Sequence, residues 1–249
     1  MIIYLIVLMK GDEAFVNEFD IAAFISVLVL TIGLSLYQLY HFKNYYENYN
    51  SRYVRFYFLL LLSLIFYVIA ESLYGTLEHL NYDQYPSIAD IFYMSYFAAA
   101  AMACFVIFKD NLCILKTQYK AISISVGVAF ILLYCVMCYP FDSENFVIGL
   151  VMISLSSTVA VFALLASFTV YSNATLRFVI IIICMAFLAN SIADAFYYTD
   201  ENYDQYSSLL WYNAIWFGTL LMISYGIMYH AIVREEQNAS TCEPKKDKE

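Results

Sequence analysis

Apolar residues fill seven long stretches of the chain, and short polar segments separate them. About 20 helical residues, each rising about 1.5 Å, cross a hydrocarbon core of about 30 Å. The pattern therefore predicts an all-α bundle of seven transmembrane helices, at about 20–42, 53–77, 88–108, 118–139, 146–171, 175–198 and 208–233. A transmembrane β-barrel would show short segments of alternating polarity instead of these long apolar runs. Because the connections are short, we expect consecutive helices to be antiparallel neighbours.

The composition indicates that the lipid bilayer is the main partner of the chain. Of 249 residues, 63% are hydrophobic and only 13% are charged, and the mean hydropathy is +0.69. A soluble domain cannot bury that much apolar surface. We therefore expect a multi-pass protein of the cell membrane.

Basic residues predict how the helices are oriented, because short cytoplasmic loops retain Lys and Arg. Eleven of the twelve fall on one side of the predicted bundle: Lys43, Arg52, Arg55, Lys109, Lys116, Lys120, Arg177, Arg234, Lys245, Lys246 and Lys248. The other side carries Lys10 and most of the acidic residues. The N-terminus is therefore expected outside and the C-terminus in the cytoplasm. The net charge of −9 argues against nucleic acid as a partner.

Three parts of the chain follow from this assignment. Residues 1–19 are expected to form an extracellular or interfacial segment, since 1–9 are apolar but lack the basic region of a signal peptide. Residues 20–233 form the transmembrane domain. Residues 234–249 form a cytoplasmic tail.

A repeated motif predicts that the domain is internally duplicated. Ile-Ala-Glu-Ser-Leu-Tyr at 69–74 ends the second helix, and Ile-Ala-Asp-Ala-Phe-Tyr at 192–197 ends the sixth. Asn-Tyr-Asp-Gln-Tyr follows each motif, at 81–85 and 202–206. Residues 20–108 and 146–233 are therefore predicted to be parallel repeat halves, joined by a linker helix at 118–139, in a 3+1+3 arrangement.

A third copy of the motif, Ile-Ala-Asp-Ile-Phe-Tyr at 88–93, opens the third helix. Pro86 suits a first turn, Ser87 can cap the helix, and Asp90 completes a capping box. A carboxylate also suits the positive end of the helix dipole. Asp90 is thus open to two interpretations, a helix cap or a ligand-binding residue.

Two acids lie inside the apolar stretches, in the outer third of their helices. Placing the carboxylates of Glu71 and Asp194 at that depth costs on the order of 2–3 kcal/mol each. The outer halves of the helices contain no Lys or Arg to pair with them. We expect them to face the bundle interior, protonated or cation-bound, although snorkelling to the outer interface is the alternative.

The predicted duplication would bring these two acids to similar depth around one outward-facing cavity. Asn190 lies one turn before Asp194, on the same helix face. Trp211, Asn213 and Trp216 are natural walls for such a cavity. The predicted ligand-binding residues are Glu71, Asp90, Asn190, Asp194, Trp211 and Asn213.

The stretch at 85–93, Tyr-Pro-Ser-Ile-Ala-Asp-Ile-Phe-Tyr, followed by Tyr96, resembles a family of multi-helix prokaryotic membrane domains. In that family a Pro-Ser-x-Ala-Asp-x-x-Tyr motif opens one helix, and an Ala-Asp-x-x-Tyr motif closes a helix in each half. Such domains often precede sensor histidine kinases and diguanylate cyclases, and they also occur alone. The resemblance covers helices two, three, six and seven and implies a sensory or ligand-binding module.

The chain departs from that family in two places. Residues 207–211 read Ser-Ser-Leu-Leu-Trp where the family has an acid before the aromatic residue, and fifteen residues follow Arg234. A tail of that length leaves no room for a kinase or cyclase output domain. The resemblance therefore implies that a signal passes to a separate cytoplasmic protein.

Two other functions stay open, a transporter of small solutes or ions and a structural subunit of a membrane complex. Parallel 3+1+3 halves occur in sugar-efflux and PQ-loop carriers, but the Pro-Gln dipeptides of those carriers are missing here. An enzyme is not expected. His41, His79 and His230 fall at opposite ends of the helices, and no Gly-x-Ser-x-Gly or His-Glu-x-x-His motif occurs.

No cofactor or metal is predicted either. The seventh helix lacks the Lys that a retinal Schiff base requires. Cys135 and Cys138 form a Cys-x-x-Cys pair without a second pair or a nearby His to complete a zinc site, so we assign them to helix packing.

Overall fold

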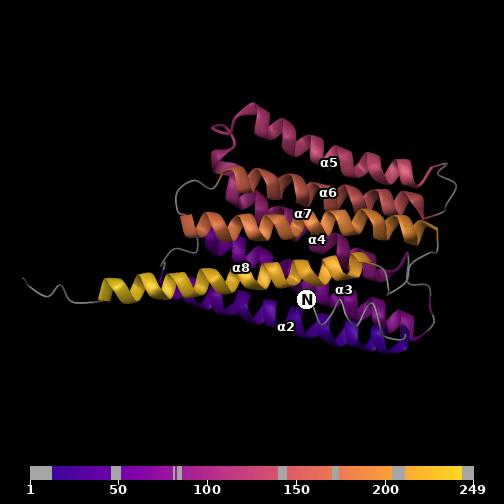
Figure 1. Ribbon diagram of the computed structural model, residues 1–249, viewed down its shortest axis with the longest axis horizontal. Helices are drawn as coiled ribbons and strands as arrows, with labels where there is room; N and C mark the ends of the chain where they lie inside the picture. The colour runs from indigo at the N-terminus through magenta and orange to yellow at the C-terminus, as the bar shows by residue number, and fades with distance from the viewer. Residues whose placement is uncertain are drawn as a thin grey trace, which may run out of the picture.

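The computed structural model describes residues 13–45, 52–80, 82, 86–139, 145–169, 174–203 and 211–242. Within these ranges lie seven long helices (Figure 1) and one short 3-10 turn, η1 (Lys109–Asn111). The helices are α2 (Glu13–Tyr45), α3 (Arg52–His79), α4 (Ile88–Phe108), α5 (Thr117–Met137), α6 (Phe146–Thr169), α7 (Ala174–Asn202) and α8 (Trp211–Cys242). Each is long and apolar enough to cross a membrane. The predicted all-α fold, with seven helices able to span a membrane, is confirmed.

Several helices extend past their predicted bounds. The sequence places an N-terminal segment at 1–19, yet α2 already begins at Glu13, and residues 1–12 lie outside the described part. Similarly, α8 continues through the predicted tail to Cys242, well beyond its apolar span at Trp211–Val233. Hydropathy marks where apolar residues end, whereas a helix continues into water as long as its backbone hydrogen bonds persist. Most of the two Asn-Tyr-Asp-Gln-Tyr segments also lie outside the described residues.

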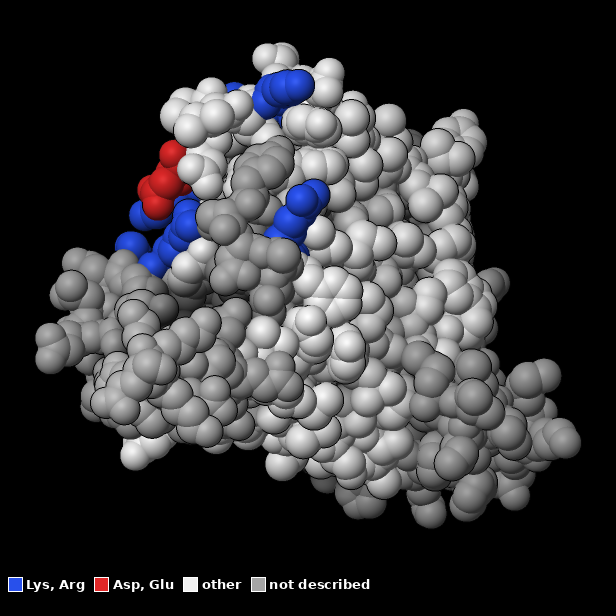
Figure 2. All heavy atoms as spheres, turned by 60° about the vertical axis from the view of Figure 1, so that its left-hand side comes forward, with Lys and Arg blue, Asp and Glu red and all other residues white. Residues whose placement is uncertain are grey.

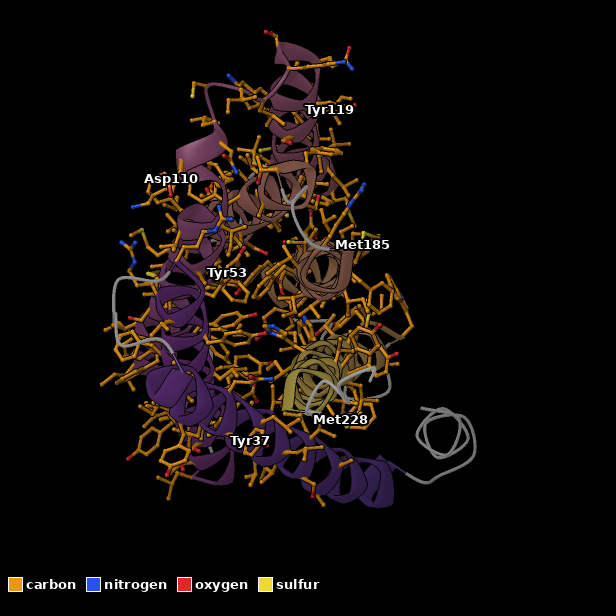
Figure 3. The ribbon with its side chains drawn as sticks, turned by 90° about the vertical axis from the view of Figure 1, so that its left-hand side faces the viewer. Tyr37, Tyr53, Asp110, Tyr119, Met185 and Met228 are labelled. Carbon is orange, nitrogen blue, oxygen red and sulfur yellow. The ribbon has the colours of Figure 1, made fainter. Side chains whose placement is uncertain are left out.

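Six of the helices form a closed ring. Neighbouring pairs in contact are α2 with α3, α3 with α4, α4 with α6, α6 with α7, α7 with α8, and α8 with α2. Helix α5 lies outside this ring, against α6 and α7, as Figure 1 shows at its upper edge. Viewed along the bundle in Figure 3, Tyr119 of α5 and Tyr37 of α2 lie on opposite sides.

Small residues allow the ring helices to approach closely. Helix α4 buries Ala100 and Ala103, and α6 buries Ala160 and Ala163. In a bilayer such residues favour helix association, because van der Waals packing replaces the hydrophobic effect as a driving force. On the outer helix, Gly127 lies so close to the side chain of Val161 on α6 that an added Cβ would clash. At this point α5 and α6 approach closely because residue 127 has no side chain.

Hydrogen bonds between side chains also join the ring helices. The hydroxyls of Thr31 on α2 and Ser224 on α8 are 2.6 Å apart, and the side-chain amide of Gln38 donates to the carbonyl of Ile227 at 2.9 Å. The Tyr57 hydroxyl on α3 lies 2.6 Å from Nδ1 of His230 on α8. Interhelical polar contacts of this kind contribute roughly 0.6 kcal/mol each on average in membranes. They fix the helices in register more than they stabilise the bundle.

The described charges divide between the two ends of the bundle. The described Lys and Arg side chains lie where α3, α5 and α7 begin and where α4 ends: Arg52, Arg55, Lys109, Lys116, Lys120 and Arg177. Figure 2 shows basic side chains gathered at this end of the bundle. Glu71, Asp90, Asp194 and Asp200 lie toward the opposite end, while Asp110 lies beside Lys109. We call these the basic end and the acidic end.

Candidate functional site

A cavity of about 60 Å³ lies toward the acidic end, inside the six-helix ring. Four ring helices contribute its lining: Tyr67, Glu71 and Tyr74 from α3, Asp90, Tyr93, Tyr96 and Phe97 from α4, Asn190, Asp194, Tyr197 and Tyr198 from α7, and Trp216 from α8. One water molecule needs about 10–15 Å³ of such volume. The cavity therefore has room for a small ligand or roughly four water molecules.

Asp194 is deeply buried at this cavity, with 4% of its surface exposed. Its Oδ2 accepts hydrogen bonds from the Ser156 hydroxyl and, at 2.8 Å, from the side-chain amide of Asn190. Its Oδ1 accepts a hydrogen bond from the indole nitrogen of Trp216 at 3.0 Å. These donors come from α6, α7 and α8, and they replace the water that a carboxylate loses on burial. Asp194 therefore links three helices.

Glu71 lies across the cavity on α3 and is half-buried. The Tyr93 hydroxyl on α4 donates a hydrogen bond to its Oε1 at 2.9 Å. Tyr67, one turn earlier on α3, is in hydrogen-bonding contact with Glu71 and also lies within electrostatic reach of Asp194. Both acids thus face the bundle interior, and a tyrosine lies within reach of each.

Asp90 has the geometry of a helix cap. The backbone nitrogen of Ser87 donates to Oδ2 of Asp90 at 2.6 Å, and the Ser87 hydroxyl accepts from the nitrogen of Ala89 at 3.2 Å. This is the capping box expected from the sequence. Asp90 also lines the cavity and is buried, so the same side chain caps α4 and forms part of the cavity wall.

The other predicted site residues differ in whether they lie at the cavity. Asn190 lies beside Asp194, as its spacing predicts. Trp211 is 50% exposed and packs edge-on against Phe196, with ring centroids 4.9 Å apart. Asn213 is buried but does not line the cavity. On α8 the cavity wall is Trp216, and a ligand-binding role for Trp211 or Asn213 stays a prediction without support from this geometry.

The sequence did not predict several residues that line the cavity or contact its acids. Tyr67 precedes Glu71 by one helical turn, so a same-face argument could have found it. Tyr96 follows the motif at 85–93, but no spacing argument in the sequence places it at the cavity. Ser156 lies on α6, and its contact with Asp194 follows from how α6 packs against α7, a detail that no local pattern shows.

The cavity offers carboxylate oxygens, hydroxyls, one amide and aromatic faces. Among the described side chains, no group of three or more His, Cys, Asp or Glu comes together as a metal centre would require. The twelve lining residues include three acids, and none of the twelve is Lys or Arg. This lining favours a cation over an anion or an apolar ligand.

The cysteine pair at the end of α5 lies apart from this cavity. Cys135 and Cys138 are free thiols, and Cys138 is fully buried. Burial raises the pKa of the Cys138 thiol, which disfavours the reactive thiolate. This environment agrees with a role in helix packing.

Comparison of the chain with protein-family models finds no match, and comparisons with curated proteins and with solved structures find none either.

Proposed function

We propose that the chain is a sensory membrane module whose central cavity binds a small cation of the ammonium type. The observation that carries this proposal is the pairing of Glu71 and Asp194, from α3 and α7, at one buried cavity with aromatic walls. Carboxylates provide charge, and the faces of Tyr and Trp attract cations through their quadrupoles. The volume of about 60 Å³ limits the ligand to a few non-hydrogen atoms.

The proposed duplication explains why two acids meet there. The repeat pairs α2 with α6, α3 with α7 and α4 with α8. Under this pairing each ring contact corresponds to another: α2–α3 to α6–α7, α3–α4 to α7–α8, and α2–α8 to α6–α4. The hydrogen bonds follow the same rule, because Glu71 and Asp194 each bind an aromatic side chain that lies 22 residues later, Tyr93 and Trp216. These matches support two parallel halves around an axis through the cavity.

The proposed orientation places the cavity toward the outside of the cell. The described Lys and Arg side chains gather at the far end, as expected of the cytoplasmic face. A reporter fused after Arg234 should then behave as cytoplasmic and one inserted near Asp142 as external. The reverse pattern would overturn the orientation.

A route for a signal leads from the cavity along α8. Trp216 on this helix donates to Asp194, so a cation that competes for the carboxylate changes the contacts of α8. The same helix continues past Val233 to Cys242, at the basic end. We propose that a separate cytoplasmic signalling protein reads this end of α8. The resemblance to sensor-type membrane domains agrees with this role.

The experiment uses the two tryptophans of the chain as reporters. In W211F, Trp216 is the sole tryptophan and lies at the cavity. Titrating this variant in nanodiscs with ammonium, methylammonium, tetramethylammonium and sodium chlorides should give saturable fluorescence changes for at least one organic or ammonium cation. In W216F, the remaining Trp211 should not respond.

Acid variants of the reporter protein decide the result. E71Q/D194N in the W211F background should abolish the response, because both negative charges are lost while the side-chain shapes remain. D110N is the matched control, since Asp110 lies exposed at the opposite end and should leave the response unchanged. A response that survives E71Q/D194N, or no saturable response to any of the cations, would overturn the proposal.

Transport is the second candidate, and one observation favours it. A smaller cavity of about 10 Å³ shares Tyr67, Tyr96 and Asn190 with the first and adds the polar Ser63 and Thr219. Polar groups thus extend from the acids toward the middle of the ring, and the Tyr57–His230 pair lies nearer the basic end. Cation flux into liposomes that depends on Glu71 and Asp194 would favour transport, whereas binding without flux would favour sensing.

A further inference from the structure

A second hollow, of about 370 Å³, lies between α3 and α4 at the basic end, away from the acids. Most of its surface is apolar, from side chains that include Phe58 on α3 and Met102 and Phe105 on α4. Two cationic side chains complete it, Arg55 on α3 and Lys109 at the end of α4. None of the residues that line the central cavity lines this groove.

The groove opens to the lipid side of the ring. Phe58 is 55% exposed and Met102 is 49% exposed, although both lie within apolar membrane spans. The opposite faces of the same two helices carry Glu71 and Tyr93 into the ring. An occupant of the groove therefore comes from the bilayer and has no access from the central cavity.

On both helices, the groove is lined by a cationic side chain at the basic end and by apolar side chains farther along the helix. Arg55 lies one turn before Phe58 on α3, and Lys109 lies one turn after Phe105 on α4. The two cations consequently lie at the same end, where Figure 2 shows basic side chains gathered, and the apolar floor runs from them toward the middle of the membrane. A phospholipid has this same arrangement, with a charged headgroup at the interface and acyl chains directed inward.

We propose that this groove binds one anionic phospholipid, with its phosphate between Arg55 and Lys109 and an acyl chain along Phe58, Met102 and Phe105. Charge complementarity favours an anionic lipid, because the described lining contains two cations and no acid. Asp110 follows Lys109 in sequence, but its side chain is exposed and does not line the groove. Basic pockets between transmembrane helices at the cytoplasmic side are suited to anionic headgroups.

Native mass spectrometry of the full chain, released from detergent after mixing with phosphatidylglycerol and phosphatidylcholine, tests this proposal. The unsubstituted protein should retain one phosphatidylglycerol in preference to phosphatidylcholine. R55Q/K109Q should weaken this preference about 30-fold, since each basic residue near the surface contributes roughly a fivefold gain in affinity. K116Q/K120Q removes two positive charges at the same end of the bundle, from the N-cap and first turn of α5, and should keep the preference.

Two results with these double variants would overturn the proposal. One is a phosphatidylglycerol preference that survives R55Q/K109Q. The other is an equal loss in K116Q/K120Q, which would indicate attraction by the basic end as a whole. If R55Q/K109Q does not fold, the single substitution K109E replaces it, because Lys109 lies in the short η1 turn and Arg55 is kept. The phosphatidylglycerol preference of K109E should fall at least about fivefold. An unchanged preference in K109E would also contradict the proposal.

Discussion

The two acids of the central cavity occupy different surroundings, although their helices are equivalent in the proposed repeat. Asp194 is almost fully buried and accepts hydrogen bonds from three helices, through Ser156, Asn190 and Trp216. Glu71 is half-buried and accepts a hydrogen bond from Tyr93 on the adjacent helix. The comparison indicates a division of roles, in which Asp194 holds the helices together and couples the cation to α8, while Glu71 makes the stronger contact with the cation.

The largest expected effect follows from removing each acid completely. Asp194→Leu leaves the side-chain donors of Asn190 and Trp216 without their acceptor, at up to about 3 kcal/mol each, and leaves the Ser156 hydroxyl with Ser191, while it relieves roughly 2–3 kcal/mol of carboxylate desolvation. We expect the free energy of unfolding to fall by about 3 kcal/mol. Glu71→Leu should change it by less than about 1 kcal/mol, because the losses at Tyr93 and Tyr67, around a carboxylate that is only half-buried, nearly cancel the relief.

Reversible unfolding in mixed micelles, with increasing fractions of dodecyl sulfate, measures both values. Asp194→Asn is the control, since an amide oxygen still accepts part of the hydrogen bonding. A Glu71→Leu protein that is destabilised as much as Asp194→Leu would contradict the division of roles.

The next effect compares the two aromatic donors. Trp216→Phe removes the hydrogen bond to the buried carboxylate of Asp194 and should lower the free energy of unfolding by about 2 kcal/mol. Tyr93→Phe removes the hydrogen bond to the half-buried Glu71 and should cost about 1 kcal/mol. The same unfolding assay compares them, and the reverse order would show that burial of the acceptor does not set the cost.

The sequence predicted the acids but not their neighbours, for a physical reason. The cost of a carboxylate in lipid depends on its depth, so Glu71 and Asp194 stand out in any apolar stretch. Which tryptophan faces them depends on how α8 is rotated against α7, and Trp211 and Trp216 differ by about 140° around a helix. Local pattern does not determine that rotation. The spans followed from hydropathy, whereas the position of α5 outside the ring follows from which helices pack together, which hydropathy does not encode.

A smaller effect is expected on cation affinity when Glu71 and Asp194 are neutralised one at a time. If Glu71 meets the cation directly, E71Q in the W211F reporter should weaken the best-bound cation about tenfold, or about 1.4 kcal/mol. D194N should weaken it less, because three donors already offset much of the Asp194 charge. Fluorescence titration of the two single variants gives both dissociation constants. A greater loss in D194N would assign ligand contact to Asp194 instead.

The smallest effect is expected at the tryptophan that faces away from the acids. Trp211 is 50% exposed and packs edge-on against Phe196, so Trp211→Phe keeps an aromatic ring in place and leaves no buried donor unpaired. We expect the free energy of unfolding to change by less than about 0.5 kcal/mol. The unfolding assay used for Trp216→Phe provides the comparison, since both changes replace one indole by a phenyl ring. Equal losses in the two variants would mean that the indole contributes through its size alone, and the hydrogen bond from Trp216 to Asp194 would then not stabilise the ring.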